Sequence, residues 1–420
     1  MRVSTFMILV LFVVSAGLLV WSVSQAGQAD YIDGRRIYRF AAWGAAEEMR
    51  QLRSEVIDPI NAASETFRIE VIAIPGDYNT KLLTMVAGGT GPDFFYLSQE
   101  FIPLWSRQGA LMDLTDMVER DESPVCDLSD YYQAVLDQYR RDGRLYALPW
   151  IAMPVVMYCN VDLFADAGVP LPDDSWDWQR FIQAGQQLTR DTDGNGQIDT
   201  WGFLLHQWPP IQIWIWQAGG QLIDRRTGQV QLSDPAVLRG AQFKADLINR
   251  YRVAPPLSRI DSGVHKPFQA GNAAMFFGGA ADDHDRIEGL NVVVRPLPKG
   301  PAGPATFAWS AGLCISPHVD DPEQAFEVYK LLLEGIQRWK IPAPRRTLAA
   351  EIEQIEPRKA AAAEAIRTAM EHMQPPRGLI HAARFSDLLW REFEEPLLRG
   401  HASAEQLARP AEQRLQEIAP

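Results

Sequence analysis

The order of apolar and polar positions after the N-terminal segment alternates between strand and helix patterns. Residues 38–43 and 94–97 are short apolar runs, and residues 67–74 alternate apolar with polar side chains, so all three are expected to be strands. Residues 47–61 and 78–87 carry apolar side chains at helical spacing. This strand–helix order predicts parallel βαβ units in an open α/β sheet, where ligands bind beyond the carboxyl ends of the strands.

The same rhythm continues through the second half of the chain and predicts a second α/β body. Residues 145–150 are expected to form an extended crossover, and residues 296–304, rich in proline and glycine, a hinge-like stretch. Further strands are expected at 155–158, 273–277, 292–294 and 313–316, and helices at 162–167, 178–188, 235–251 and 322–334.

The first 29 residues have the pattern of an export signal. Arg2 is the only charge before Asp30, residues 6–23 are almost wholly apolar, and small polar residues follow. The apolar run is also long enough to span a bilayer, so an uncleaved N-terminal anchor is the alternative. Either way, we expect a periplasmic or otherwise extracytoplasmic protein, possessing a signal peptide or a transmembrane helix at residues 1–29.

Composition agrees with a folded protein of about two domains. The chain has 420 residues, of which 47% are hydrophobic and 22% charged. Its net charge of -13 argues against nucleic acid as a partner and favours neutral over phosphorylated substrates. Cys126, Cys159 and Cys314 are too few and too widely spaced for a disulfide framework or a CxxC zinc site, although one pair could be bridged.

Thirteen tryptophans are a high number for this length, and this excess is a first hint of function. Sugar rings stack their apolar C–H faces on aromatic side chains, while their hydroxyls need polar partners. Tryptophans near expected strand ends or crossovers are candidates for such stacking, with a place in the core as the alternative; they are Trp43, Trp150, Trp208, Trp214 and Trp309. Trp178 and Trp216 lie in apolar periodic segments and are expected in the core.

Polar candidates follow the first strands. Glu100 comes directly after Ser98 and Gln99 at the end of an expected strand, where a carboxylate could accept hydrogen bonds from two sugar hydroxyls. Glu47 stands in the first turn of a helix and either contacts ligand or interacts with the helix dipole. Tyr78 either donates its phenol to ligand or packs.

Residues 191–199 have the spacing of a calcium-binding loop. Oxygen-bearing residues occupy alternate positions, namely Asp191, Asp193, Asn195, Gln197 and Asp199. The bidentate glutamate expected at position twelve is absent, because Gly202 stands there. The loop therefore predicts either a weak structural calcium site or a solvated turn, and no other cofactor is expected.

Several catalytic signatures are missing from the chain. It has no GxxxxGK[ST], HExxH or GxSxG sequence, and no GxGxxG after a strand, so it is not itself an ATPase of the P-loop type. A glycosidase would need two facing carboxylates, and no motif marks such a pair.

Taken together, six segments resemble the extracellular solute-binding proteins of ABC importers, specifically the sugar-binding family that includes maltose-binding protein. The segments occur in the family's order and are residues 81–93, 147–150, 158–164, 188–203, 268–278 and 400–405. The resemblance implies a two-lobed type II periplasmic-binding-protein fold, each lobe an open sheet flanked by helices, with three crossovers near Trp150, Thr306 and Pro342. Lobe 1 would comprise residues 30–150 plus 306–340, and lobe 2 residues 151–305 plus 341–420.

The resemblance also implies a function. A sugar would bind in the cleft between the lobes, and the closed receptor would deliver it, as a monomer, to a membrane permease whose ATPase is a separate chain. The expected ligand-binding residues are Trp43, Gly44, Glu47, Tyr78, Ser98, Gln99, Glu100, Trp150, Trp208, Trp214, Gly278, Gly279, Trp309 and Arg345. A solvated loop is the alternative for Arg345. The chain departs from the family where a pocket tryptophan often follows the strand at 273–277, because Ala280 and Ala281 stand there. An exported carbohydrate-active enzyme and a sugar-sensing receptor are the rival functions.

Overall fold

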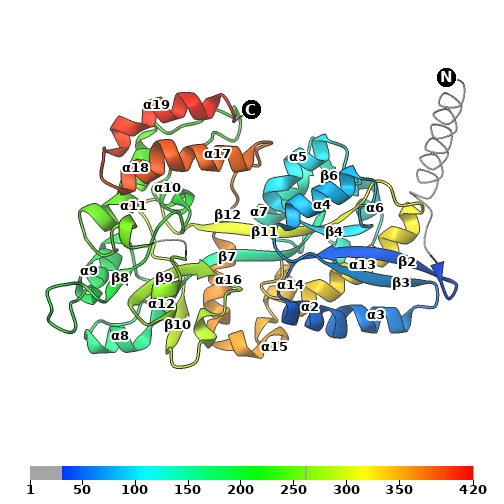
Figure 1. Ribbon diagram of the computed structural model, residues 1–420, viewed down its shortest axis with the longest axis horizontal. Helices are drawn as coiled ribbons and strands as arrows, with labels where there is room; N and C mark the ends of the chain where they lie inside the picture. Colours follow the sequence, from blue (N-terminus) through cyan, green and yellow to red (C-terminus); the bar gives the residue numbers. More distant parts are fainter. Residues whose placement is uncertain (1–30, 261–262, 420) are drawn as a thin grey trace, which may run out of the picture.

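Two long strands connect the two lobes of the protein (Figure 1). The computed structural model describes residues 31–260 and 263–419. β7 (Leu148–Asn160) pairs with β11 (Thr306–Ile315) and, further along, with β9 (Ala273–Gly279). The two lobes therefore share one ten-stranded sheet of order β1-β2-β4-β11-β7-β9-β8, with β3, β10 and β12 paired off this path.

The long strands differ from the sequence expectation. The crossover expected at residues 145–150 and the strand expected at 155–158 form one strand of 13 residues, and β11 begins well before residue 313. At about 3.3 Å per residue, β7 extends roughly 43 Å, which is enough to reach from one lobe into the other. Sequence alternation does not reveal this continuity because nearly all of β7 is buried on both faces.

Lobe 1 is built around the parallel strands β2 and β3. Along β3 the side chains of Phe67 and Ile69 are buried while Arg68 and Glu70 face solvent, as the alternation predicts. The elements of this lobe are β1 (Tyr31–Ile32), β2 (Arg35–Ala42), α2 (Ala46–Leu52), η1 (Arg53–Ile57), α3 (Asp58–Ala63), β3 (Phe67–Ala73), α4 (Tyr78–Ala87), β4 (Phe94–Ser98), η2 (Gln99–Phe101), α5 (Ile102–Arg107), α6 (Thr115–Glu119), η3 (Pro124–Cys126), α7 (Gln133–Leu136), η4 (Asp137–Tyr139), β5 (Arg140–Arg141), β6 (Arg144–Leu145) and α13 (Pro322–Trp339).

Lobe 2 packs a second hydrophobic core around β8 and β9. Its elements are α8 (Val161–Asp166), α9 (Trp178–Leu188), β8 (Trp201–Phe203), α10 (Ile211–Gln217), α11 (Pro235–Asn249), η5 (Leu257–Arg259), α12 (Lys266–Gln269), η6 (His284–Arg286), β10 (Val292–Arg295), α17 (Ala382–Leu389), η8 (Trp390–Glu394), α18 (Glu395–Leu398) and α19 (Ala404–Gln416).

Helix starts in lobe 2 follow local side-chain chemistry. Asp177 and Asp234 accept hydrogen bonds from the first backbone N–H groups of α9 and α11, and Ser403 forms a capping box with Gln406 at α19. Gly240 of α11 lies so close to α10 that a Cβ atom would come within 2.5 Å of the Trp214 carbonyl oxygen. This close approach brings together the two helices behind one wall of the cavity described below.

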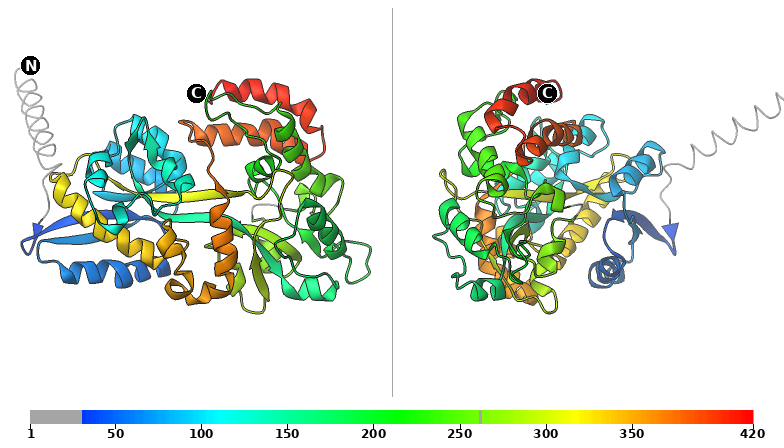
Figure 2. Two further views of the ribbon diagram at one scale, coloured as in Figure 1. Left: turned by 180° about the vertical axis from the view of Figure 1, so that it is seen from behind. Right: turned by 60° about the vertical axis from the view of Figure 1, so that its left-hand side comes forward.

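The chain after β11 contributes to both lobes. The backbone of Tyr132 donates to the Pro344 carbonyl, and that of Arg346 donates to the Asp130 carbonyl, so this stretch lies beside lobe 1. From there the chain crosses the joining strands, as Figure 2 shows from behind. This part of the chain comprises α14 (Arg346–Ala349), α15 (Ile352–Ile355), η7 (Pro357–Ala362) and α16 (Ala363–Glu371), and β12 (Met373–Gln374) then precedes the helices of lobe 2. The division of residues into lobes given above stays a prediction.

Two further expectations concern the termini and the cysteines. Within residues 31–260 and 263–419, no helix is long and apolar enough to cross a membrane. The export signal or anchor expected at residues 1–29 lies outside the described residues. Cys126, Cys159 and Cys314 are all buried and free, so no two of them form a disulfide bond in the structure.

Candidate functional site

A cavity of about 670 Å³ lies where the two lobes face each other above β11. Lobe 1 contributes side chains from η2, α5 and η4. The strand β11 supplies Phe307 and Trp309. Lobe 2 contributes side chains from α10, the loop before it, residues 221–225 and the segment 375–386. The same elements can be followed along the upper side of the molecule in Figure 1. Four of the expected ligand-binding residues line the cavity, namely Gln99, Glu100, Trp208 and Trp309.

Aromatic rings form much of the cavity wall. Phe307 and Trp309 are two residues apart on β11 and therefore point to the same face of the sheet. Trp216 of α10 stacks on Phe307, with ring centroids 6.1 Å apart and an interplanar angle of 18°. Phe101, Trp208 and Phe385 complete this aromatic lining. Such flat apolar surfaces suit the C–H face of a sugar ring.

Trp208 is held in the loop before α10 by hydrogen bonds on two sides. Its indole Nε1 donates to the Phe277 carbonyl at the end of β9, at 2.5 Å. Behind the loop, the ammonium of Lys244 donates to the carbonyls of Gln207 (3.3 Å) and Pro209 (2.8 Å), which flank Trp208. The orientation of this half-buried ring is therefore fixed by the backbone of lobe 2.

Lys244 is also paired with Glu394 of η8, and both side chains are almost completely buried. Burial lowers the pKa of Lys244 and raises the pKa of Glu394, because each charge is removed from water. The pair links the Trp208 loop to the helical segment α17–η8, whose first half lines the cavity. One buried ion pair thus ties together two parts of the lobe 2 wall.

The polar residues of lobe 1 are positioned by β11. Gln99 donates from Nε2 to the Ala308 carbonyl (3.0 Å) and accepts from the Ser310 hydroxyl (2.7 Å), which in turn accepts from Tyr139 (2.9 Å). This network fixes η2 and sets the neighbouring Glu100 at the cavity. Burial raises the pKa of Glu100, and its own backbone N–H partly offsets the shift.

Trp43 belongs to an aromatic group next to the cavity rather than to its lining. Its ring contacts Tyr78, Tyr96 and Trp309 at centroid distances of 4.9, 5.1 and 6.4 Å, and Trp150 stacks on Tyr96 at 4.4 Å. Trp309 therefore both contacts this aromatic group and lines the cavity. Whether Trp43 and Trp150 affect ligand binding stays a prediction.

Tyr78 has a packing role in the structure. Its hydroxyl donates to the Ala41 and Tyr96 carbonyls, both at 3.0 Å, and joins β2 to β4. Burial raises the pKa of Tyr78 far above its ordinary value. Of the two alternatives for this residue, the structure favours packing.

The remaining expected residues lie outside the cavity lining, and for two of them the expectation is corrected. Trp214 is 0% exposed in the core of lobe 2, stacked near Phe277 at 5.4 Å. Arg345 is 1% exposed and pairs with Glu334 (3.0 Å) and Asp130 (3.8 Å), so it neither reaches the cleft nor lies in a solvated loop.

Five other residues occupy structural or surface positions. Glu47 is exposed and pairs with Arg50 in the first turns of α2, while Ser98 is buried at the end of β4. At Gly278 and Gly279 of β9, a Cβ atom would collide with Tyr158 or Met153. Gly44 has a φ of 154°, and a Cβ atom there would collide with Met49 and Glu48.

Sequence reasoning missed two parts of the lining. Trp216 was expected in the core, and although it is only 8% exposed, its ring borders the cavity. No binding residue is expected from the sequence in the segment 375–386, yet this segment supplies one wall. Phe307 could have been found from the sequence, since strand periodicity places it on the face of Trp309.

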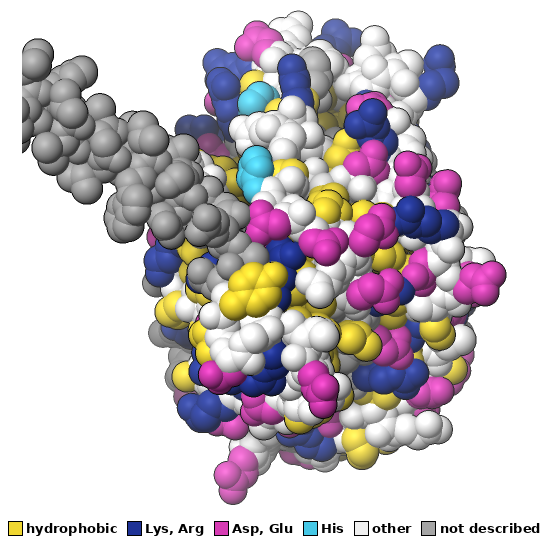
Figure 3. Space-filling model, turned by 90° about the vertical axis from the view of Figure 1, so that its right-hand side faces the viewer, with side chains coloured by type: hydrophobic (Ala, Val, Ile, Leu, Met, Phe, Trp, Pro, Cys, Tyr) yellow, Lys and Arg dark blue, Asp and Glu magenta, His cyan; other side chains and the backbone are white. Residues whose placement is uncertain are grey.

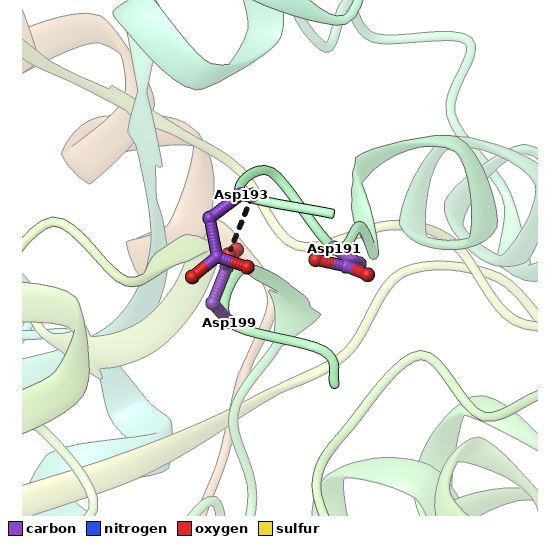
Figure 4. A group of neighbouring side chains, drawn as sticks. All are labelled: Asp191, Asp193 and Asp199. Carbon is purple, nitrogen blue, oxygen red and sulfur yellow. Dashed lines mark hydrogen bonds between the residues drawn. The ribbon is translucent and has the colours of Figure 1, made fainter. Parts of the chain in front are cut away.

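The calcium-like loop brings its acids together. One carboxylate oxygen from each of Asp191, Asp193 and Asp199 lies within 4.8 Å of the others. Figure 4 shows Asp193 and Asp199 next to each other, joined by a 3.3 Å hydrogen bond from the Asp193 N–H to the Asp199 carboxylate, with Asp191 across the loop. The Asn195 side-chain oxygen accepts from the Gln197 N–H, at 2.8 Å. This oxygen-rich donor set fits a hard cation such as calcium.

The two lobes, the strands that join them and the cavity between them define the architecture of a solute-binding protein. The family of bacterial extracellular solute-binding proteins matches residues 67–334, which is more than half of the chain. The chain belongs to this family, whose members bind solutes outside the cytoplasm.

Similar proteins support this assignment. A solved ABC substrate-binding protein of Listeria monocytogenes in complex with cycloalternan has a TM-score of 0.76 at 23% identity, covering 91% of this chain and 98% of that one. The cyclic alpha-maltosyl-1,6-maltose binding protein of Arthrobacter globiformis has a TM-score of 0.77 at 19% identity, covering 92% and 99%. These structural similarities show that the chain has the same fold as these two proteins.

Curated relatives match over shorter stretches. An arabinooligosaccharide-binding protein of Halalkalibacterium halodurans is 27% identical over 198 residues, which cover 47% of this chain and 40% of that protein. A probable ABC transporter-binding protein of Deinococcus radiodurans is 23% identical over 245 residues, covering 55% and 56%. The chain thus spans about half the length of these relatives.

Proposed function

We propose that this protein is an extracytoplasmic receptor that binds a mono- or oligosaccharide between its lobes and delivers it to the permease of an ABC importer. The observation that carries the proposal is the cavity between the lobes, which is lined by stacked aromatic rings together with Gln99 and Glu100. Aromatic faces with a few polar groups are the composition that carbohydrate recognition needs. The oligosaccharide ligands named for similar proteins agree with it.

Closure of the lobes about β7 and β11 would couple binding to transport. A ligand that contacts both walls of the cavity is held more tightly when the lobes approach, so it shifts the population towards the closed form. The closed receptor would dock on the permease as a monomer, and a separate chain would supply the ATPase. The apolar residues 6–23 would serve as a cleaved export signal or as an anchor.

Two rivals share part of this evidence. An exported carbohydrate-active enzyme would need two facing carboxylates, whereas Glu100 is the one acidic side chain among the described residues that line the cavity. A sugar-sensing receptor would have the same cleft but a different partner. The cavity lining therefore supports a binding role over hydrolysis.

Isothermal titration of residues 30–420 against a panel of mono- and oligosaccharides tests the proposal. Micromolar binding of a sugar that is recovered intact is the expected result. Release of new reducing ends would make the protein an enzyme, and absence of binding across the panel would contradict the sugar ligand.

Calcium binding in the loop at residues 191–199 is a second, structural proposal, supported by the convergence of Asp191, Asp193 and Asp199. Calcium titration of chelator-treated protein should show weak uptake that Asp191→Asn abolishes. Glu288→Gln, an exposed position on the same lobe, is the matched control. No uptake by the unchanged protein at millimolar calcium contradicts the proposal.

A further inference from the structure

Basic side chains gather at the cavity in a way that the overall charge of the chain does not suggest. Arg225, Arg377, His381 and Arg384 line it, against the single carboxylate of Glu100. The whole chain, in contrast, carries 53 acidic and 40 basic residues. Figure 3 shows the far end of lobe 1, where acidic and basic side chains are interspersed. The excess of basic groups at the cavity is therefore opposite in sign to the net charge of the chain.

The arginines at the cavity have no carboxylate partner among the described residues. Arg377 donates to the backbone carbonyls of Asp224 (2.6 Å) and Arg225 (3.1 Å), and Arg225 donates to the Pro375 carbonyl (3.3 Å). No ion pair within 4.0 Å involves either residue or Arg384 in the parts of the chain that the structure describes. Carbonyl oxygens orient these guanidinium groups without neutralising their charge.

The nearest acid on this wall is engaged elsewhere. Asp224 precedes Arg225, but its carboxylate accepts hydrogen bonds from the Thr227 hydroxyl (2.9 Å) and from the backbone N–H groups of Thr227 and Arg226. These bonds lower the pKa of Asp224 and hold its carboxylate in the turn. The guanidinium groups therefore lack an acidic partner on their own wall.

Neighbouring helices show the opposite arrangement. Arg391 pairs with Asp387 (2.7 Å), Arg399 with Glu395 (2.8 Å) and Arg414 with Glu392 (2.7 Å), all on lobe 2 and outside the cavity lining. Arginines with acidic partners thus occur on the same lobe, whereas Arg225, Arg377 and Arg384 at the cavity have none among the described residues.

Lobe 1 adds a further arginine behind the same wall. Arg141 of β5 packs so closely on the segment 375–386 that a Cβ atom at Gly378 would lie 1.7 Å from its Nη2. This Nη2 is buried and has no hydrogen-bond partner. Burial lowers the pKa of Arg141; the carboxylate of Asp142 opposes this shift, and the charge of Arg377 adds to it. Arg141 therefore adds positive charge behind this wall, although it does not itself line the cavity.

We infer that the ligand of this cleft is an acidic carbohydrate, whose carboxylate, sulfate or phosphate groups pair with Arg225, Arg377 and Arg384 while its rings stack on the aromatic wall. Guanidinium groups bind planar or tetrahedral oxyanions through two parallel hydrogen bonds, which a neutral hydroxyl cannot reproduce. The inference rests on the proposed function and specifies its substrate class. It also replaces the preference for neutral sugars that the net charge alone suggested.

Titration of residues 30–420 with matched pairs of ligands tests the inference. Each pair contains an acidic sugar and its neutral counterpart. Trigalacturonate is compared with galactotriose, and glucuronate with glucose. Galactose 6-sulfate and galactose 6-phosphate are each compared with galactose. The acidic member should bind at least tenfold more tightly, and raising the salt from 0.05 to 0.5 M should weaken that member more. The arms of the panel distinguish carboxylate, sulfate and phosphate as the recognised group.

Variants separate the charge at the cleft from charge in general. Arg384→Gln should reduce the preference for the acidic member by about fivefold, the order expected for a partly exposed ion pair. Arg409→Gln, on the exposed side of α19, is the matched control and should leave the preference unchanged.

The outcomes distinguish the inference from the function on which it rests. Equal or tighter binding of the neutral members overturns the acidic ligand and leaves the sugar receptor standing. An equal effect of Arg384→Gln and Arg409→Gln also overturns it, since the cavity would then have no special role. Failure of every member of the panel to bind overturns the proposed function itself.

Discussion

Two groups of aromatic residues meet at Trp309 and differ in what surrounds them. On one side, Trp43, Tyr78, Tyr96 and Trp150 pack against one another at the carboxyl ends of β2 and β4. On the other side, rings from α10, β11 and the Trp208 loop face a cavity of about 670 Å³. The residue types are alike, so the tertiary surroundings rather than the side chains separate packing from recognition.

The role of a charged side chain likewise depends on its tertiary surroundings. Arg345 is 1% exposed and forms ion pairs with Glu334 and Asp130, whereas Arg384 lines the cavity and has no acidic partner among the described residues. A buried charge must be paired within the protein, because its desolvation is otherwise too costly. A charge at a cleft can instead be paired by a ligand.

Trp150→Ala tests the packed group and should give the largest loss of stability. Removing a nearly fully buried tryptophan is expected to lower the free energy of unfolding by about 3–5 kcal/mol. Urea denaturation measures this loss, and titration of the folded fraction measures the sugar affinity separately. A large loss of affinity without a loss of stability would place Trp150 in the binding machinery.

Lys244→Met tests whether the buried ion pair supports the cavity wall. Leaving Glu394 buried without its partner should lower the free energy of unfolding by about 3 kcal/mol. The double variant with Glu394→Leu should recover most of this stability, because no unpaired charge remains. The double variant should still bind sugar more weakly, since the Gln207 and Pro209 carbonyls lose their donor; full recovery of affinity would contradict a positioning role.

Trp208→Ala tests the cavity group. It should weaken sugar binding by about 1–3 kcal/mol, or roughly fivefold to 150-fold, because a stacking surface is lost. Trp208→Phe keeps an apolar ring and should recover part of the affinity. Isothermal titration measures both, and an unchanged affinity for the alanine variant would remove Trp208 from the site.

Glu100→Gln should have the smallest effect, seen as a change in pH dependence. Burial raises the pKa of Glu100 above its unfolded value, so its contribution to stability is fully present below the unfolded pKa and is lost as pH rises through the folded pKa. The free energy of unfolding of the unchanged protein, relative to the variant, should therefore fall by less than about 1 kcal/mol as pH rises from 4 to 7. Urea denaturation across this range measures it, and a relative gain in stability with rising pH would contradict the sign.

Most elements could be predicted from the sequence, since their signals are local. The helices at 78–87 and 178–188 begin and end where apolar spacing and the Asp177 cap place them. The length of β7 could not be predicted, because a strand buried on both faces has no alternation. Trp214 and Trp208 are equally plausible in sequence, and the structure places the first in the core and the second at the cavity.

The sequence by itself determined the class of fold, the order of strands and helices, and the position of Gln99 and Glu100 at a strand end. These follow from periodicity and turn chemistry within short windows of the chain. The tertiary structure decided which aromatics face the cavity, that residues 375–386 form one of its walls, and that arginines far apart in the chain meet there without acidic partners. Such properties depend on contacts between lobes and on burial, which arise when distant segments pack together.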